Sequence, residues 1–174
     1  DRYDLGRVPA VKNTITISEI FGPVIQGEGP LIGKPTLFVR TGGCDDRCHW
    51  CDTPYAVLPE HAKTWVEMTP RDIIAKLKEL AMPSTLVTLS GGNPALQGAL
   101  GHVIEAGHAI GYTFACETQG THVAAWFNQL DWLIISPKGP SSGNVTPDQS
   151  IAECVLSFGK GTRVALKVVV ASDE

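Results

Sequence analysis

The hydrophobic pattern after Lys34 constrains the fold most, because short strand-like runs alternate with helical stretches through the rest of the chain. Strand-like runs occupy residues 35–41, 85–90, 112–117, 131–136 and 163–170, and helical patterns occupy residues 69–80, 95–106, 122–130 and 147–158. The stretch 69–80 has the clearest signals, with Thr69 at the N-cap position and Pro70 as the first helical residue. Repeated strand–helix units with nearly continuous apolar strands predict an α/β fold, a parallel sheet covered by helices.

The hydrophobic periodicity does not distinguish two arrangements of this sheet: an open doubly wound sheet, or a full or partial barrel. In both, the chemistry belongs at the carboxyl ends of the strands. Four loops follow strands, at residues 42–55, 91–95, 118–121 and 137–144, and we expect them to converge at one end of the sheet. Ahead of this unit, residues 14–20 alternate like a half-buried strand and residues 21–33 read as a loop rich in glycine and proline.

Composition sets broad limits on the protein class. The 174 residues are 43% hydrophobic and 18% charged, which predicts a single globular domain over residues 1–174. No apolar run approaches the roughly 20 residues of a membrane helix, and residues 1–9 lack a signal-peptide pattern, so we expect a cytoplasmic protein without membrane contact. Net charge is −4 and the basic residues are scattered, which argues against direct nucleic-acid binding. Because the chain ends directly after a strand-like run, we also expect further C-terminal sequence.

Cys44, Cys48 and Cys51 are separated by gaps of three and two residues on a predicted loop. This is metal-ligand spacing rather than disulfide spacing, and thiolates favour zinc, copper(I) and iron–sulfur clusters. A structural zinc site needs a fourth ligand, for which His49 and His61 are the nearby candidates. A fully ligated ferredoxin-type cluster needs a fourth cysteine.

The other two cysteines do not supply that ligand, since Cys116 lies in an apolar strand and Cys154 in a helix, and both are expected in the core. Three ligands leave one iron of a four-iron cluster open to a cofactor or substrate. This spacing, with Trp50 just before the third cysteine, resembles the signature of the radical S-adenosylmethionine (SAM) superfamily. The resemblance implies a [4Fe–4S] cluster whose open iron binds SAM and whose electron cleaves it to a 5′-deoxyadenosyl radical, with Trp50 near the adenine.

Further sequence blocks at the strand ends narrow the resemblance. The blocks are residues 25–29 (IQGEG), 38–40 (FVR), 51–53 (CDT), 88–94 (TLSGGNP), 117–121 (ETQGT) and 136–138 (SPK). Alone, Gly91-Gly92 would be an ordinary turn, but beside the cysteine loop it resembles the superfamily's Gly-Gly-Glu-Pro motif, in which glycine lets the backbone approach SAM. Asn93 replaces the usual Glu. Together the blocks resemble the 7-carboxy-7-deazaguanine synthase family.

That family converts 6-carboxy-5,6,7,8-tetrahydropterin to 7-carboxy-7-deazaguanine with loss of ammonia, as a lyase on the route to queuosine-type 7-deazapurines used in tRNA modification. The resemblance implies a partial (shortened) TIM-like βα barrel of the radical SAM type with an N-terminal strand extension. It also implies a homodimer, a Mg²⁺ ion and an external electron donor resembling flavodoxin. The small-molecule pterin would be the substrate, without direct contact to nucleic acid.

The resemblance also implies roles for individual residues, beginning with Cys44, Cys48 and Cys51 as cluster ligands. The SAM contacts it implies are Trp50, Cys51, Asp52, Gly92, Ser136, Pro137 and Lys138. The substrate contacts it implies are Ile25, Gln26, Gly27, Arg40 and Ser90, and the Mg²⁺ ligand is Thr53, with the substrate carboxylate completing the site. No general acid or base is assigned.

Each role has an alternative that the residues alone leave open. Arg40 at the end of a buried strand needs an anion, which could be the carboxylate of Glu28 or Glu117 instead of the substrate. Gln26 could bond within its own loop, and Thr53 could serve only a turn before Pro54.

Two rival functions also remain. A radical SAM activase, which makes a glycyl radical on a partner protein, shares the cysteine loop but leaves the IQGEG block and Arg40 unexplained. A zinc- or cluster-binding module without enzymatic activity is the other.

Overall fold

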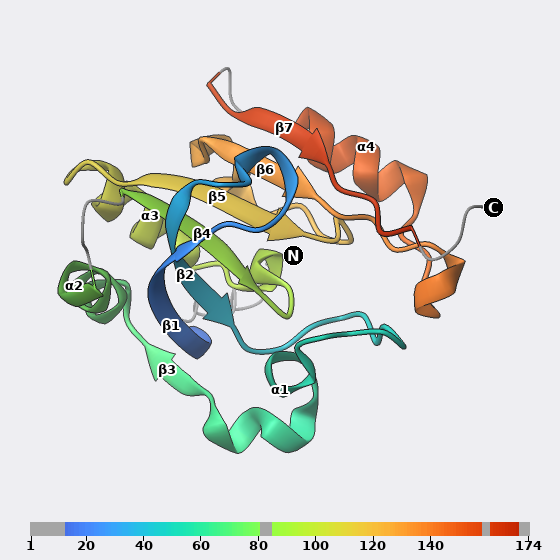
Figure 1. Cartoon of the computed structure of the whole chain (residues 1–174), viewed down its shortest axis with the longest axis horizontal. Helices are drawn as coiled ribbons and strands as arrows, with labels where there is room; N and C mark the ends of the chain where they lie inside the picture. Colours follow the sequence, from blue (N-terminus) through green and yellow to red (C-terminus); the bar gives the residue numbers. More distant parts are fainter. Residues whose placement is uncertain (1–12, 81–84, 158–160, 171–174) are drawn as a thin grey trace, which may run out of the picture.

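A single seven-stranded sheet forms the centre of the computed structural model (Figure 1), which describes residues 13–80, 85–157 and 161–170. The strand order is β3-β1-β2-β4-β5-β6-β7. Five strands pair in parallel: β2 (Pro35–Thr41), β4 (Leu86–Gly91), β5 (Thr113–Thr118), β6 (Trp132–Ile135) and β7 (Arg163–Leu166). At one edge β1 (Ile15–Ile25) and β3 (Val66–Met68) add antiparallel pairs.

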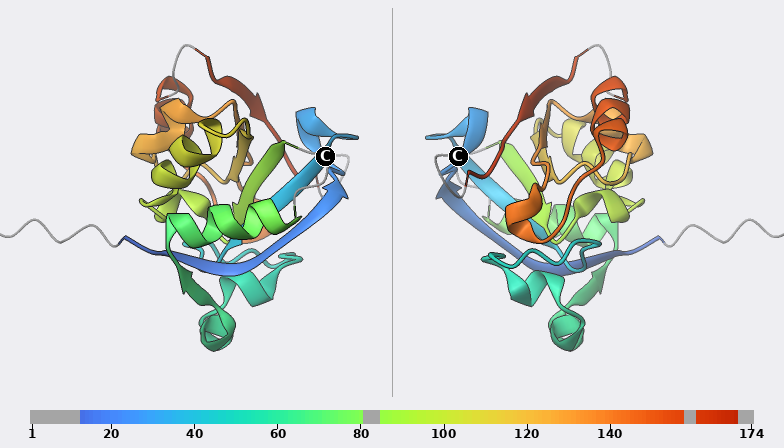
Figure 2. Two further views of the ribbon diagram at one scale, coloured as in Figure 1. Left: turned by 90° about the vertical axis from the view of Figure 1, so that its left-hand side faces the viewer. Right: turned by 90° about the vertical axis from the view of Figure 1, so that its right-hand side faces the viewer.

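This strand order distinguishes the doubly wound sheet from the barrel. The parallel strands follow chain order without reversal, whereas a doubly wound sheet reverses its order at a switch point. Successive right-handed crossovers in one direction place all connecting helices on the same face, and the sheet curls away from them. Figures 1 and 2 show the strands curving in this way. The fold is therefore a partial TIM-like βα barrel with an N-terminal strand extension, and the α/β prediction is confirmed.

Within the described residues, the connections contain four α-helices and several short 3₁₀ turns. The helices are α1 (Pro54–Val57), α2 (Pro70–Leu80), α3 (Leu100–His108) and α4 (Asp148–Leu156), and the turns are η1 (Gly29–Leu31), η2 (Pro59–Thr64), η3 (Pro94–Leu96), η4 (Ala125–Gln129) and η5 (Pro140–Ser142). Helix α2 begins as expected, because the Thr69 hydroxyl donates to Asp72 Oδ2 and accepts from the Asp72 amide. No helix among the described residues is both long and apolar enough to cross a membrane.

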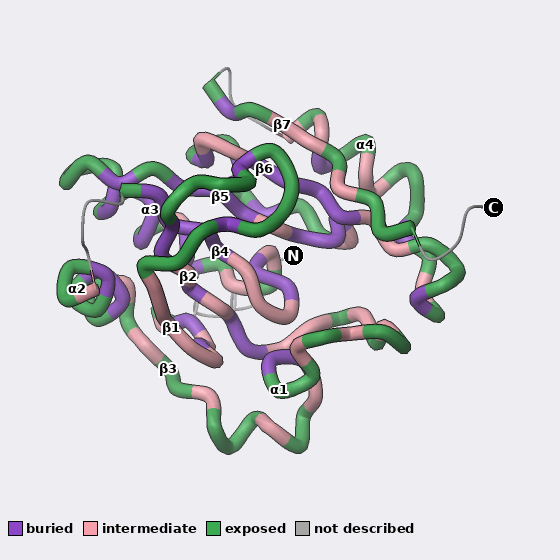
Figure 3. The backbone as a smooth tube through the Cα atoms, viewed as in Figure 1, coloured by how far each residue is buried: buried purple, intermediate pink, exposed green. Residues whose placement is uncertain are grey.

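Alternating side chains of the parallel strands fill two separate apolar clusters. The larger lies between the sheet and the helices, and contains the fully buried Cys116 and Cys154, as expected. The smaller lies inside the barrel, where Leu31 of η1 packs against Leu86, Ala115 and Ile134. The loop between β1 and β2 therefore fills part of the barrel interior, and the central strands β4, β5 and β6 are mostly buried (Figure 3).

Residues 122–130 do not form the expected α-helix, since only the 3₁₀ turn η4 is present. Trp126 and Phe127 are both buried and pack edge to face with ring centroids 5.0 Å apart. The backbone is extended at Ala124 (ψ 137°) and at Leu130 (ψ 148°), which leaves only the five residues of η4 between them, and runs this short commonly form 3₁₀ turns.

Other expected boundaries also shift. Helix α3 begins at Leu100 rather than residue 95, because Asn93 caps the separate turn η3. Strand β1 runs on to Ile25 through a register shift, where a loop was expected, and β7 ends at Leu166 rather than residue 170. Helix α4 spans Asp148–Leu156, and Phe158 of the expected 147–158 helix lies outside the described residues. Strand β3 has two exposed residues, Val66 and Glu67, and shows no apolar alternation that would reveal it.

Candidate active site at the carboxyl ends of the strands

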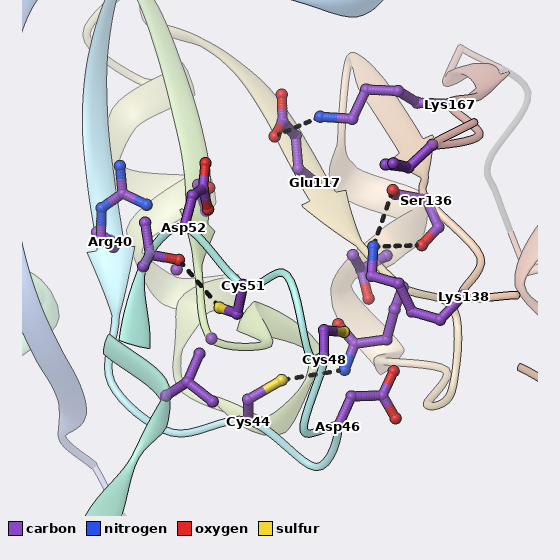
Figure 4. A pocket seen from close by; sticks show the side chains of 18 of the residues that line it. Arg40, Cys44, Asp46, Cys48, Cys51, Asp52, Glu117, Ser136, Lys138 and Lys167 are labelled. Carbon is purple, nitrogen blue, oxygen red and sulfur yellow. Dashed lines mark hydrogen bonds and ion pairs between the residues drawn. The ribbon is translucent and has the colours of Figure 1, made fainter. Parts of the chain in front are cut away.

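The loops that follow the parallel strands converge on one cavity of about 440 Å³ (Figure 4), as expected. Residues that the sequence placed at the site and that line this cavity are Gln26, Arg40, Cys44, Cys48, Trp50, Cys51, Asp52, Thr53, Ser90, Gly92, Ser136 and Lys138. Ile25, Gly27 and Pro137 are not among the lining residues. Residues that line it without having been assigned a role are Glu28, Phe38, Asp46, Val57, Gly91, Glu117, Thr118, Gln119, Lys167 and Val169.

The three cysteines of the loop after β2 are free thiols that line the cavity. Each sulfur has a polar neighbour: Gln119 Nε2 donates to Cys44 Sγ at 3.4 Å, and Asn144 Nδ2 donates to Cys48 Sγ at 3.5 Å. The Thr53 hydroxyl lies 3.8 Å from Cys51 Sγ. Burial raises the pKa of the Cys44 and Cys48 thiols, so a positive centre is needed to keep them as thiolates, the form that binds metal.

Asp45 anchors the cysteine loop to the loops after β4 and β5. Its carboxylate accepts from Asn93 Nδ2 at 2.8 Å and from Gln119 Nε2 at 2.7 Å, and lies 3.4 Å from His122 Nε2. The Asn93 side chain is fully buried, and its Oδ1 accepts from the Thr118 hydroxyl at 2.9 Å. A glutamate at position 93 would bring a second carboxylate against Asp45, whereas the amide of asparagine donates to it. This explains why Asn suits a position that is usually Glu.

Gly91 and Gly92 pack directly against the backbone of the cysteine loop. The Gly92 amide donates to Thr41 O at 3.1 Å, and the Asn93 amide donates to Gly43 O at 2.8 Å. A Cβ atom at Gly92 would overlap the carbonyl oxygen of Gly43, and Gly91 has a φ of +129°. The close approach that glycine allows here is therefore one between two loops of the site itself.

Lys138, in the loop after β6, and Asp46, in the cysteine loop, both line the cavity (Figure 4). Lys138 Nζ donates to Ser136 O at 2.9 Å and to Ser136 Oγ at 3.0 Å, and it lies 5.7 Å from the centre of the Trp50 ring. Burial lowers the pKa of Lys138 and raises that of Asp46. Asp46 Oδ2 is buried without a hydrogen-bond partner among the described residues. Such an atom costs about 1–3 kcal/mol, so this wall suits a ligand that carries hydrogen-bond donors.

The protein partner of Arg40 is Glu19, and the two candidates expected from the sequence, Glu28 and Glu117, are wrong. Arg40 Nε donates to Glu19 Oε1 at 2.7 Å. Glu19 lies opposite Arg40 in the antiparallel β1–β2 pair. Sequence reasoning placed Glu19 in a strand but missed this contact, because the pattern gives neither the strand that β1 pairs with nor the register shift between Ile17 and Glu19.

Gln26 bonds both inside and outside its own loop. Its Oε1 accepts from the Glu28 amide at 3.3 Å, and its Nε2 donates to Glu117 Oε1 at 3.1 Å. Lys167, which follows β7, donates to Glu28 at 2.9 Å and to Glu117 at 3.1 Å, and it lowers the pKa of Glu28. These contacts bridge the first and last segments around the cavity. Lys167 was missed because it lay inside a stretch expected to continue as strand.

Thr53 precedes α1 and its hydroxyl makes no helix-capping hydrogen bond. The turn that could have explained it is made by its backbone, since Thr53 O accepts from the Ala56 amide at 3.0 Å. Apart from its 3.8 Å contact with Cys51 Sγ, the hydroxyl bonds to none of the described residues, and Thr53 lines the cavity. Gln119 and Asn144 were missed as individual residues, although both lie in loops that the sequence placed at the site.

Comparisons with known proteins show which family this chain resembles. The Radical SAM superfamily matches residues 38–142. A 7-carboxy-7-deazaguanine synthase of Bacillus subtilis strain 168 is 44% identical over 164 residues, covering 92% of this chain and 68% of the relative. Proteins of the same name from Bacillus cereus (39% identity; 91% of this chain, 67% of the relative) and Neisseria meningitidis (38%; 70% and 52%) also match. The crystal structure of QueE from Escherichia coli has a TM-score of 0.70 at 22% identity, covering 92% of this chain and 85% of that one, and it supports the fold.

Proposed function

This chain belongs to the 7-carboxy-7-deazaguanine synthase family of the radical SAM superfamily, and we propose from this premise that it carries out the family's reaction in the cavity described above. The reaction converts 6-carboxy-5,6,7,8-tetrahydropterin to 7-carboxy-7-deazaguanine with loss of ammonia. The observation that carries the proposal is that three free cysteine thiols and the guanidinium of Arg40 line a single cavity.

The residues fit a [4Fe–4S] cluster and SAM. Cys44, Cys48 and Cys51 would hold the cluster, and the N–H groups of Gln119 and Asn144 that point at two of the sulfurs are the kind of contact that stabilises cluster thiolates. When bound, cluster and SAM supply one-electron chemistry that abstracts a hydrogen atom. The residues proposed to contact SAM are Trp50, Cys51, Asp52, Gly92, Ser136, Pro137 and Lys138, and the unpaired Asp46 Oδ2 nearby offers an acceptor for an N–H of its amino group.

The opposite side of the cavity suits the pterin. The Arg40 guanidinium matches a carboxylate in shape and charge, and Gln26 offers both an acceptor and a donor to a heterocycle edge. Ile25, Gly27 and Ser90 are the further substrate contacts proposed here. The chain's own contribution is to orient the pterin and hold its carboxylate still, because the cofactors supply the bond-breaking chemistry.

We also propose a homodimer and an external one-electron donor resembling flavodoxin, as the family membership implies. Direct nucleic-acid contact is not part of the proposal, since the net charge is −4 and backbone-binding proteins usually present a basic face.

Turnover of the pterin tests the proposal directly. Anaerobically reconstituted protein, supplied with carboxytetrahydropterin, SAM, Mg²⁺ and a reductant, is expected to release the deazapurine and ammonia in equal amounts, as followed by mass spectrometry. Reactions lacking SAM or reductant are the controls. Cleavage of SAM without any deazapurine, together with a glycyl radical signal on a partner protein, would instead identify an activase.

Thr53→Ala is expected to lower turnover by about tenfold or more and to weaken its dependence on Mg²⁺, because Mg²⁺ prefers oxygen donors and the Thr53 hydroxyl is its proposed protein ligand. Formation of 5′-deoxyadenosine should persist in this variant. The measurement is initial rate against Mg²⁺ concentration. Thr64→Ala is the matched control, since the Thr64 hydroxyl bonds only locally to His61 O at 2.8 Å. An unchanged Mg²⁺ response in Thr53→Ala would remove Thr53 from the metal site.

A further inference from the structure

Glu19 contacts Arg40, a residue that lines the cavity, without lining the cavity itself. It is not among the lining residues, yet its Oε1 accepts from Arg40 Nε at 2.7 Å. The same oxygen accepts from the Tyr55 hydroxyl at 2.8 Å. A register shift between Ile17 and Glu19 in β1 precedes the point where Glu19 pairs with Arg40. Such an irregularity re-aims a side chain, here toward the strand that carries Arg40.

Two aromatic rings further restrict the guanidinium of Arg40. Its carbon lies 5.6 Å from the centre of the Phe21 ring and 5.9 Å from that of Tyr55. Phe21 is itself stacked on Phe38, with ring centroids 5.1 Å apart and an angle of 7° between the planes. Stacking on aromatic faces suits arginine better than lysine. The guanidinium is thus held by one hydrogen bond and two rings.

This arrangement uses only one donor of Arg40. None of the described residues accepts a hydrogen bond from its two Nη atoms, although the side chain is only 15% exposed. Arg40 lines the cavity together with Cys51 and Asp52 (Figure 4). Because Glu19 binds the Arg40 guanidinium at Nε, the two Nη donors remain available for another group. A carboxylate suits them, since it can accept two parallel hydrogen bonds from a guanidinium.

We propose that Glu19 is a positioning residue that fixes the Arg40 guanidinium for the carboxylate of the substrate. The inference rests on the proposed function, in which Arg40 contacts that carboxylate. Tyr55 extends the arrangement, because α1 begins at Pro54, directly after Thr53. A single carboxylate oxygen of Glu19 therefore connects the proposed carboxylate-binding arginine with the helix that follows the proposed Mg²⁺ ligand.

The test compares two pterins, one with and one without the carboxylate at C6. Binding of each is measured with the cluster-loaded protein, SAM and Mg²⁺, without reductant so that no turnover occurs. Glu19→Ala is expected to weaken binding of the carboxylated pterin roughly three- to tenfold, the scale of ordering one rotamer-rich side chain. Binding of the pterin without carboxylate should not change. With reductant, KM should rise by the same factor and kcat should stay within about twofold.

Glu79→Gln is the matched control, because it removes an exposed carboxylate that pairs with Lys76 at 3.0 Å; it should affect neither ligand. Glu19→Gln keeps an acceptor of the same shape and should show a smaller shift in the same direction. It replaces Glu19→Ala if the alanine variant fails to fold. Equal weakening of both pterins, or no weakening of either, would overturn the positioning role.

Arg40→Lys separates failure of this inference from failure of the proposed function. If Arg40 binds the carboxylate, Arg40→Lys must weaken the carboxylated pterin selectively. A selective effect in Arg40→Lys without one in the Glu19 variants overturns only the positioning role. No selectivity in Arg40→Lys shows that Arg40 does not bind the substrate carboxylate, which overturns the positioning role of Glu19 as well. The proposed function itself fails only if the unmodified protein forms no deazapurine from the carboxylated pterin.

Discussion

Alanine at any one of Cys44, Cys48 or Cys51 is expected to abolish iron–sulfur cluster assembly and to lower turnover by about a thousandfold or more. Each cysteine would hold a different iron, so loss of one leaves two protein ligands for a cluster that already has one open iron. Without the cluster no electron reaches SAM. The measurements are iron and sulfide per chain after anaerobic reconstitution, and the amount of 5′-deoxyadenosine formed.

Cys154→Ala is the control for this experiment. Burial raises the pKa of the Cys154 thiol to about 11, and the residue is fully buried in the larger apolar cluster. It therefore remains a protonated core residue at neutral pH. Its replacement should lower thermal stability and leave iron content unchanged. Full iron content in Cys44→Ala, Cys48→Ala and Cys51→Ala would refute the assignment of these three ligands.

Much of this site follows from local sequence because the strands are parallel. Once residues 35–41, 85–90, 112–117 and 131–136 are recognised as apolar parallel strands, their carboxyl ends must meet. The loops containing Cys44, Gly92, Gln119 and Lys138 then face one cavity, as the structure has them. The cysteine spacing is a property of one short loop and needs no knowledge of the fold.

The contacts that hold the site in place were not predictable in the same way. Asp45, Asn93 and Gln119 come from three loops, and nothing in the composition of any one loop indicates its partners in the other two. The Arg40–Glu19 pair depends on an antiparallel register with an irregularity in it. The expected helix at 122–130 is reduced to a 3₁₀ turn because the backbone is extended on both sides of η4, at Ala124 and at Leu130, and the hydrophobic pattern does not reveal these two breaks.

Asn93 connects these two kinds of information. Sequence alone shows only that it replaces the usual Glu of the superfamily motif. The structure adds the reason, because its amide donates to Asp45 while its carbonyl accepts from Thr118. Asn93 departs from the superfamily motif, but the Asp45 carboxylate gives its amide a hydrogen-bond partner at this position. The residues Gly91 to Pro94 and Asp45 of the cysteine loop therefore form one structural unit.

Gly92→Ala is expected to disrupt the contact between this turn and the cysteine loop. Its effect should be the second largest, after loss of a cluster ligand. The added Cβ would overlap the carbonyl oxygen of Gly43 and come within 3.0 Å of Ala56 O. Both atoms are backbone and cannot rotate away as a side chain would, so the loop itself must move. Overpacking of this kind costs about 1–3 kcal/mol or more. We expect a lower midpoint of thermal unfolding in the cluster-free protein and at least a severalfold loss of iron on reconstitution.

Gly98→Ala is the matched control, because no atom lies within 4 Å of a Cβ at that position. It should leave iron content unchanged and stability equal or slightly higher, since alanine restricts the unfolded chain. The two readouts separate two roles of Gly92. A lower midpoint of thermal unfolding with full iron content would show that the turn at Gly92 stabilises the fold but does not position the cysteines. Loss of both is expected if the contact between Gly92 and Gly43 sets the position of the cysteine loop, because the hydrogen bond from Asn93 to Gly43 O would be displaced together with Cys44 beside it.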